Sequence, residues 1–240
     1  MSSQTSACVS NSLGWYEAVL RTHGVSGVIT RGVWSCHEEV PPYYSNAMTI
    51  DSSDAVTQTE VLRDLAKDLV RPYSVKDSFA LLDLAPLGLQ PLFDAEWMWR
   101  DPSSGPPAAD KPSDVEWRRV TSNAELADWE AAWRTNGSPA STRVFMPELL
   151  TPGDVVLLAG CEGGRIVAGC AANHTPGVVG FSNFFAEDAE REVLMAAAIG
   201  EIMLLAPGLP VVGYDRGDDL VHATRLGFHT VGALRVWLAE

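Results

Sequence analysis

The polar residues whose types suit chemistry gather in the second half of this 240-residue chain. Ser182 and Asn183 interrupt the apolar run VVGFSNFF (178–185). Polar side chains inside an apolar strand indicate either a cleft that they line or a strand with one exposed face. Tyr214 lies near the end of a second apolar run, PVVGYD (210–215), where it could line a cleft or cover the core.

Two histidines accompany these residues. His222 lies in the predicted last helix, and His174 lies in ANHTPG, the tip of a predicted hairpin. Imidazoles titrate near neutral pH and can move protons, but a solvated surface histidine is the ordinary alternative for both. The aspartates of YDRGDD (214–219) are too close together for a calcium loop, so Asp218 or Asp219 is expected to cap the last helix.

An acidic segment, FSNFFAEDAEREV (181–193), leads from the predicted strand into a long predicted helix without a glycine. It contains one cation, Arg191, and four carboxylates, which are Glu187, Asp188, Glu190 and Glu192. Gathered carboxylates repel an anion, and one arginine cannot cancel four of them. The segment therefore predicts weak binding of a phosphate-bearing ligand at this point of the chain.

The elements that must position these residues follow from the apolar pattern. Ser122 or Asn123 is expected to cap a helix with Glu125 in its first turn, and Gly227 is expected to end the last helix. The predicted order is β-α-α-β-β-β-α-β-α-β, with short turns joining the three consecutive strands. The predicted strands are 115–121, 154–161, 165–174, 178–185, 210–215 and 228–238, and the helices follow Ser122, lie near 143–150, and cover 187–206 and 222–227.

The first half is a reduced version of the second. Helices are predicted over 13–24, 53–69 and 79–89, and a strand over 90–100. Two more strands are expected to form a hairpin around a Pro-Pro turn. The hairpin RGVWSCHEEVPPYYSN (31–46) places histidine, glutamate and tyrosine side chains near this turn, and it is a candidate substrate-recognition loop.

A Pro/Ser/Gly-rich segment, DPSSGPPAADKPS (101–113), separates the halves and reads as a linker. The halves end alike, because adding 139 to each position of 84–99 gives 223–238, and Leu-Gly followed by an apolar strand recurs in both. This repetition favours a duplication. The predicted domains are a truncated unit over 1–100 and a complete unit over 114–240.

Composition limits the partners. The 17 Lys and Arg residues face 31 Asp and Glu residues, which gives a net charge of −14. Nucleic acids and anionic membranes need a cationic face, so neither is expected as a partner. The four cysteines form no CxxC pair, so no metal site is expected, and reduced thiols together with the absence of a leader or membrane span predict a cytoplasmic protein.

The eight tryptophans are shared equally between the halves. Trp129 and Trp133 stand one helical turn apart and are expected in the core. Trp97 and Trp99 point to one face of a strand. Packing between the halves and an aromatic-lined ligand cleft between them both explain such a distribution.

The element order of 114–240 and the ending TRLGFHTVGALRVWL (224–238) resemble the GNAT superfamily of N-acetyltransferases. The first half resembles it over about 13–100, so the chain looks like a tandem GNAT-like protein. The implied fold class is α/β (α+β), with two halves that each hold a mixed, mostly antiparallel sheet flanked by helices. The first half is truncated.

The resemblance also implies a site. Enzymes of this family bind the pyrophosphate of acetyl-CoA, their acyl substrate, on backbone N–H groups between the fourth strand and the next helix. The residues carried over to that cofactor site are Phe184, Phe185, Ala186 and Arg191. Ser182, Asn183 and His174 are the corresponding substrate-binding candidates. The family's tyrosine acid falls on Ala223, so Tyr214 and His222 are the catalytic candidates.

Two functions remain open on this basis. The first is acyl transfer from acetyl-CoA or another acyl-CoA to a small-molecule amine, with backbone N–H groups of 178–185 polarising the carbonyl. The second is a GNAT-like ligand-binding or interaction protein that has lost CoA chemistry, which the acidic segment favours. A homodimer is compatible with either.

Overall fold

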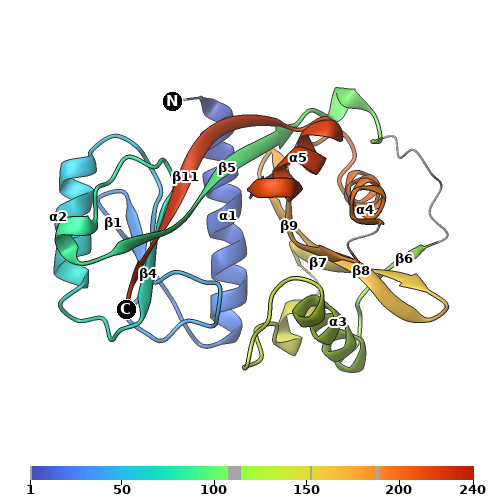
Figure 1. Ribbon diagram of the computed structural model, residues 1–240, viewed down its shortest axis with the longest axis horizontal. Coiled ribbons are helices and arrows are strands. Elements are labelled where there is room, and N and C mark those ends of the chain that lie inside the picture. The colour runs from blue at the N-terminus through green and yellow to red at the C-terminus, as the bar shows by residue number, and fades with distance from the viewer. Residues whose placement is uncertain (1, 108–114, 152, 188–189) are drawn as a thin grey trace.

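The computed structural model describes residues 2–107, 115–151, 153–187 and 190–240. Their strands join in one mixed sheet with the order β1-β2-β3-β4-β11-β5-β10-β9-β8-β7-β6 (Figure 1). Residues 108–113 of the predicted linker and Asp188 lie outside the described residues. The strands are β1 Val28–Thr30, β2 Val33–Ser35, β3 Ala47–Thr49, β4 Tyr73–Asp77, β5 Gln90–Arg100, β6 Glu116–Arg119, β7 Val155–Glu162, β8 Arg165–Thr175, β9 Val178–Ala186, β10 Val211–Asp215 and β11 His229–Ala239.

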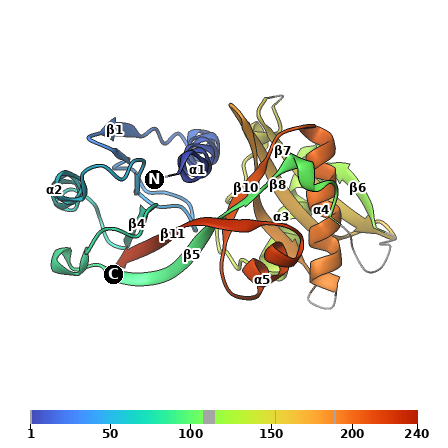
Figure 2. The same cartoon turned by 90° about the horizontal axis from the view of Figure 1, so that it is seen from above.

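The centre of the sheet is the antiparallel pair β5 and β11, which cross the whole molecule in Figure 2. Ala95 pairs with Leu234, and these positions differ by the 139 residues that relate the similar chain endings. On one side of this pair Asp94 faces Arg235, and on the other Glu96 faces Ala233, so the register is self-complementary. Such a register is typical of a twofold interface, and it favours the predicted duplication.

The flanking strands repeat this relation. β4 pairs antiparallel with β11, and β10 pairs antiparallel with β5. Beyond them, β3 lies parallel to β4, and β9 lies parallel to β10. The last strand therefore lies between two strands of the first half, and the two halves share one sheet instead of having separate ones.

The helices are α1 Ser3–Thr22, α2 Ala55–Leu65, α3 Asn123–Thr135, α4 Arg191–Leu205 and α5 Gly217–Arg225. The predicted start of α3 is confirmed: Ser122 and Glu125 form a capping box, and the pKa of Glu125 is lowered to about 2, first by the N–H of Thr121. None of the described helices has the length and apolar character needed to cross a membrane.

Helix α1 begins ten residues before the predicted 13–24 and lies between the two sides of the molecule in Figures 1 and 2. Although it opens the first half, it packs on β8, β9, β10 and β5. Two side-chain amides hold it there: Asn11 donates to the carbonyl of Asn173 at 3.0 Å, and Asn173 donates to the carbonyl of Asn11 at 2.9 Å. A helix of the first half thereby covers strands of the second.

The predicted helix over 79–89 is wrong. Its only helical part is a 3-10 turn over Ala85–Leu87, because Asp77 accepts the backbone N–H groups of Phe79 and Leu82 and curls the chain into a turn. Strand β4, which precedes this turn, was not predicted because its sequence YSVKD buries Lys76 and Asp77 and lacks an apolar alternation. The short helix predicted near 143–150 is a 3-10 turn over Pro147–Leu150.

Substitution at the central pair tests whether the chain unfolds as one unit. Leu234 is fully buried, so we expect Leu234→Ala to lower the free energy of unfolding by about 2–5 kcal/mol. Urea unfolding followed by tryptophan fluorescence and by circular dichroism should give one shared transition. The control Leu204→Ala, at a side chain that is 75% exposed, should change the stability by less than about 0.5 kcal/mol. Two separate transitions would contradict the single unit.

Candidate functional site

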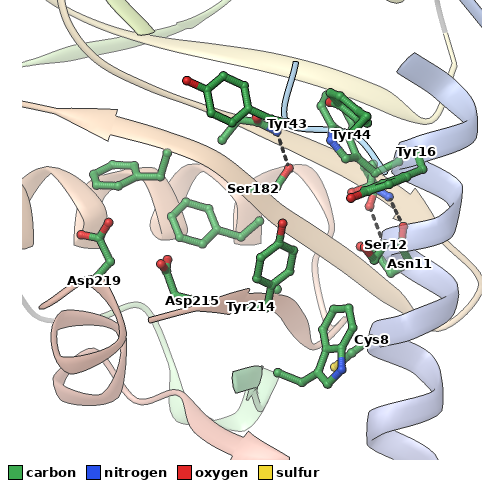
Figure 3. Close-up of a pocket in the computed structure, with 17 residues that line it drawn as sticks. Cys8, Asn11, Ser12, Tyr16, Tyr43, Tyr44, Ser182, Tyr214, Asp215 and Asp219 are labelled. Carbon is green, nitrogen blue, oxygen red and sulfur yellow. Dashed lines mark hydrogen bonds between the residues drawn. The ribbon is translucent and has the colours of Figure 1, made fainter. Parts of the chain in front are cut away.

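The candidate site lies where β9 and β10 separate. The two strands pair only at Val179 with Val211 and at Gly180 with Val212. Beyond these pairs a cavity of about 200 Å³ opens, bounded by β9, β10, α1 and the loop that carries Tyr43 and Tyr44 (Figure 3). It is therefore a pocket between the two halves, at the edge of a parallel strand pair.

Two backbone features accompany this separation. A Cβ on Gly213 would lie 2.5 Å from the carbonyl oxygen of Phe181, so only glycine allows this close approach of β10 to β9. In β9, the pairing with β8 shifts between Phe185 and Ser182, and Asn183 takes a positive φ of 51°. This bulge removes two residues from the regular ladder and turns the backbone toward a new direction.

Eight of the 17 residues that line the cavity are aromatic. Tyr16 and Tyr44 meet at 5.0 Å between ring centroids, and Trp97 meets Tyr214 at 5.4 Å. The remaining lining residues are Cys8, Asn11, Ser12, Trp15, Tyr43, Asn173, Phe181, Ser182, Asn183, Phe184, Gly213, Asp215 and Asp219. Such a wall suits a small ligand with an apolar body and a few polar groups.

The cavity is polar at two opposite ends, as Figure 3 shows. At one end, Asn11 and Ser12 of α1 face it. At the other end stand Asp215 and Asp219. Burial, with the Asp219 carboxylate as a second cause, raises the pKa of Asp215 to about 7. Asp215 can therefore hold or release a proton near neutral pH.

The Asp219 carboxylate has a partner outside the cavity. Arg191, in the first turn of α4, binds it in a bidentate pair of 2.5 and 2.7 Å, and the Arg191 guanidinium also lies 5.2 Å from the ring centroid of Phe184. Bidentate pairs of this kind are among the stronger charged contacts in proteins. The ion pair joins α4 to α5 beside the acidic end of the cavity.

A second set of charged contacts joins the same two helices. Glu192 of α4 meets Nδ1 of His222 at 2.6 Å and Nη1 of Arg225 at 3.1 Å. Glu187 pairs with Arg165 of β8. The start of α4 therefore presents carboxylates that are already engaged by cations of the chain.

These contacts test whether the start of α4 fits the pyrophosphate of acetyl-CoA. The only cation in its first turn holds Asp219, and the surrounding side chains of Glu187, Glu190 and Glu192 are acidic. An incoming diphosphate would meet this negative charge and would compete with Asp219 for Arg191. The residues present here do not fit the pyrophosphate.

The structure brings together some of the residues named from the sequence. Ser182, Asn183, Phe184 and Tyr214 line the cavity. Phe185 and Ala186 are buried behind it, and Phe185 packs on Trp129.

Three more of these residues lie elsewhere. Arg191 acts through Asp219, at the edge of the cavity. His222 is held by Glu192 and does not line the cavity, and His174 lies exposed at the far end of β8.

Several lining residues were not named as site residues from the sequence. Asn11 and Ser12 precede the predicted start of their helix, and Asp215 was assigned only to a capping segment. Tyr43 and Tyr44 belong to the hairpin that was a candidate recognition loop, and Trp97 is one of the tryptophans considered for a cleft between the halves. Within the described part of the chain, His, Cys, Asp and Glu residues form no cluster that could hold a metal ion.

No family model and no curated protein matches the sequence. Solved structures do match the fold. A GCN5-related N-acetyltransferase from Kribbella flavida is 15% identical with a TM-score of 0.68, over 98% of this chain and 95% of that one. A conserved protein of unknown function from Staphylococcus epidermidis ATCC 12228 is 15% identical with a TM-score of 0.63, over 90% and 94%. A Novosphingobium aromaticivorans DSM 12444 protein, described as a GNAT-family acetyltransferase, is 14% identical with a TM-score of 0.57, over 96% and 95%.

These matches confirm the resemblance drawn from the element order and the Leu-Gly-Phe ending. They also cover the first half, so the likeness is not limited to 114–240. The chain has the GNAT N-acetyltransferase fold along almost its whole length.

Proposed function

We propose that this protein is an acyltransferase that transfers an acyl group from a thioester to a small-molecule amine in the cavity between β9 and β10. The observation that carries this proposal is the place of Asp215, a carboxyl group with a pKa raised to about 7, in a cavity at the separating strands of a GNAT fold. Titratable groups with shifted pKa values in a cleft are candidates for catalysis.

Asp215 is suited to act as a general acid. The amine nitrogen attacks the acyl carbon, so a C–N bond forms and the bond from the acyl carbon to sulphur breaks. The protonated Asp215 gives its proton to the leaving sulphur. Backbone N–H groups in the bulge at Asn183 and Phe184 would stabilise the negative charge that develops on the carbonyl oxygen.

The proposed acyl donor is a thioester, which need not be acyl-CoA. The start of α4 does not fit a pyrophosphate, whereas the aromatic walls of the cavity accept an uncharged acyl chain. A pantetheine-like thioester without the diphosphate would avoid the carboxylates of α4.

A second function is favoured by the ion pair of Arg191 with Asp219. This pair closes α4 on α5 at the side where the family binds its donor. If the pair stays closed, the cavity binds a small ligand without chemistry, and the protein is a binding module. Measurements of turnover separate the two functions.

Donor preference provides the first test. We expect S-acetylpantetheine to give a higher kcat/KM than acetyl-CoA at low salt, since only CoA carries phosphates toward the acidic start of α4. Added salt should narrow the difference, because exposed charges are screened. The double variant Glu187→Gln, Glu190→Gln should tighten acetyl-CoA binding in calorimetry and leave S-acetylpantetheine unchanged. A preference for acetyl-CoA that is unaffected by these substitutions would place the donor elsewhere. Absence of turnover with either thioester would favour the binding module.

The role of Asp215 provides the second test. We expect Asp215→Asn to lower kcat about 100-fold, because the amide cannot give a proton to the leaving sulphur. Wild-type kcat should fall as the pH rises above about 7, where Asp215 loses its proton. The matched variant His222→Asn should keep kcat within about twofold, since His222 does not line the cavity and a proton donor there has no path to it. A larger loss of kcat in His222→Asn than in Asp215→Asn would assign the general acid to His222.

The raised pKa of Asp215 also predicts a pH-dependent stability. The folded state holds this proton up to about pH 7, whereas the carboxyl of the unfolded chain releases it near its ordinary pKa of 3.8. The contribution of Asp215 to stability is therefore lost as the pH rises from about 4 to about 7. We therefore compare the free energy of unfolding of Asp215→Asn with that of wild type, by urea unfolding at pH 4 and at pH 8. Between these two pH values, the difference should shift by about 1–3 kcal/mol in favour of the variant. The exposed control Asp128→Asn should show no such change, and a constant difference for Asp215→Asn would show that the carboxyl is not desolvated.

A further inference from the structure

A buried lysine lies directly behind the cavity wall. Lys76 of β4 is 0% exposed, and its Nζ lies 2.8 Å from Oγ of Ser12 on α1. Among the described residues, no ion pair includes Lys76. Unlike a buried lysine in an ordinary salt bridge, this amine has a hydroxyl as its polar partner.

Three aromatic rings surround the same nitrogen. Nζ of Lys76 lies 3.9 Å from the ring centroid of Tyr214, 4.8 Å from that of Trp97 and 5.2 Å from that of Tyr16. All three rings line the cavity, and so does Ser12. The amine is thus separated from the cavity by one layer of side chains, and the Ser12 hydroxyl is the polar group of that layer that reaches it.

Burial without a carboxylate favours the neutral amine. Moving an ammonium group out of water costs several kcal/mol, and burial lowers the pKa of Lys76 well below its usual value. A neutral amine has a lone pair and can accept a proton from Ser12. The rings stabilise the ammonium that then forms.

The titratable neighbours of Lys76 do not supply a permanent negative charge. Burial raises the pKa values of the Tyr16, Tyr44 and Tyr214 phenols, and that of the Cys8 thiol to about 12. These groups stay neutral near pH 7.

Three charged groups on the surrounding strands are engaged with other partners. Next to Lys76 on β4, Asp77 accepts hydrogen bonds from the turn after the strand, and Arg235 of β11 pairs with Asp94 of β5. Asp215 lies at the opposite end of the cavity.

We propose that Ser12 and Lys76 form the proton-accepting pair of the cavity. As the acceptor amine attacks the acyl carbon, Oγ of Ser12 takes a proton from the amine nitrogen and passes its own hydroxyl proton to Nζ of Lys76. The role rests on the proposed acyl transfer, and it supplies the base that Asp215, as the acid, cannot supply. Ser12 and Asp215 lie at opposite ends of the cavity (Figure 3), so the amine would bind toward α1 and the leaving sulphur toward Asp215.

Nuclear magnetic resonance measures the charge on Lys76 in the intact protein without any substrate. The chain has three lysines, Lys67, Lys76 and Lys111, so a sample with 13C at lysine Cε gives few signals, and Lys67→Arg assigns one of them. We expect the Lys76 signal to titrate far below the usual range of a lysine side chain, because burial lowers the pKa of this amine. A Lys76 that stays charged at the assay pH would overturn the pair.

Kinetics test the link between the two residues. Lys76→Met and Ser12→Ala should each lower kcat/KM about 100-fold, and the double variant should be no worse than either single variant, because the residues act as one unit. In wild type, kcat/KM should fall at low pH with the same midpoint as the Lys76 signal. In Lys76→Met this fall of kcat/KM at low pH should disappear. Lys67→Met should leave the pH profile unchanged. Additive losses, or a fall at low pH that survives in Lys76→Met, would overturn the pair.

The outcomes separate this inference from the proposed function. Lys76→Met replaces a buried amine by an apolar side chain of similar length, so the melting temperature should be unchanged. If Lys76→Met lowers the melting temperature, the kinetics of Ser12→Ala test the pair instead. Turnover in wild type with a charged Lys76 would reject only the proton-accepting pair. No turnover in wild type with any thioester would reject the acyl transfer and, with it, the role of the pair.

Discussion

The short ladder between β9 and β10 is the constraint on which the site depends. Two residue pairs hold the strands together, and Gly213 still lies so close to the Phe181 carbonyl that no side chain fits there. The strands separate beyond this point. A longer ladder would close the cavity, because paired strands lie about 5 Å apart. The side chains of β9 and β10 can therefore line the cavity because the pairing of the two strands ends here.

The central pair β5 and β11 makes the other wall possible. Because β11 lies between β4 and β5, the two halves share one sheet, and α1 can lie on β8, β9 and β10. The reciprocal amides of Asn11 and Asn173 fix the helix there and bring Ser12 to the cavity. The same sheet brings Lys76 of β4 against Tyr214 of β10. The site is composite, and neither half holds it alone.

The second half could be predicted from its sequence because its elements follow simple local rules. Ser122 with Glu125, the three-strand meander and the closing Leu-Gly-Phe all appear as expected. Strand β4 could not be predicted, since Lys76 and Asp77 are buried by partners from distant parts of the chain. The cavity was only partly predictable for the same reason. Tyr214 and Ser182 interrupt local patterns, whereas Ser12 and Asn11 reach the site through long-range packing.

Part of the negative charge of the chain lies at one place in the structure. From the sequence, the net charge of −14 argues only against polyanionic partners. In the structure, Glu187, Glu190 and Glu192 place part of this charge at the start of α4, where the resemblance to the GNAT family implies a diphosphate site. Arg191, the one cation in the first turn of α4, is bound to Asp219. At the α1 end of the cavity, burial favours the neutral form of the Lys76 amine. In the acyl transfer that we propose, this arrangement favours a donor without phosphates, and protons move between the two ends of one small cavity.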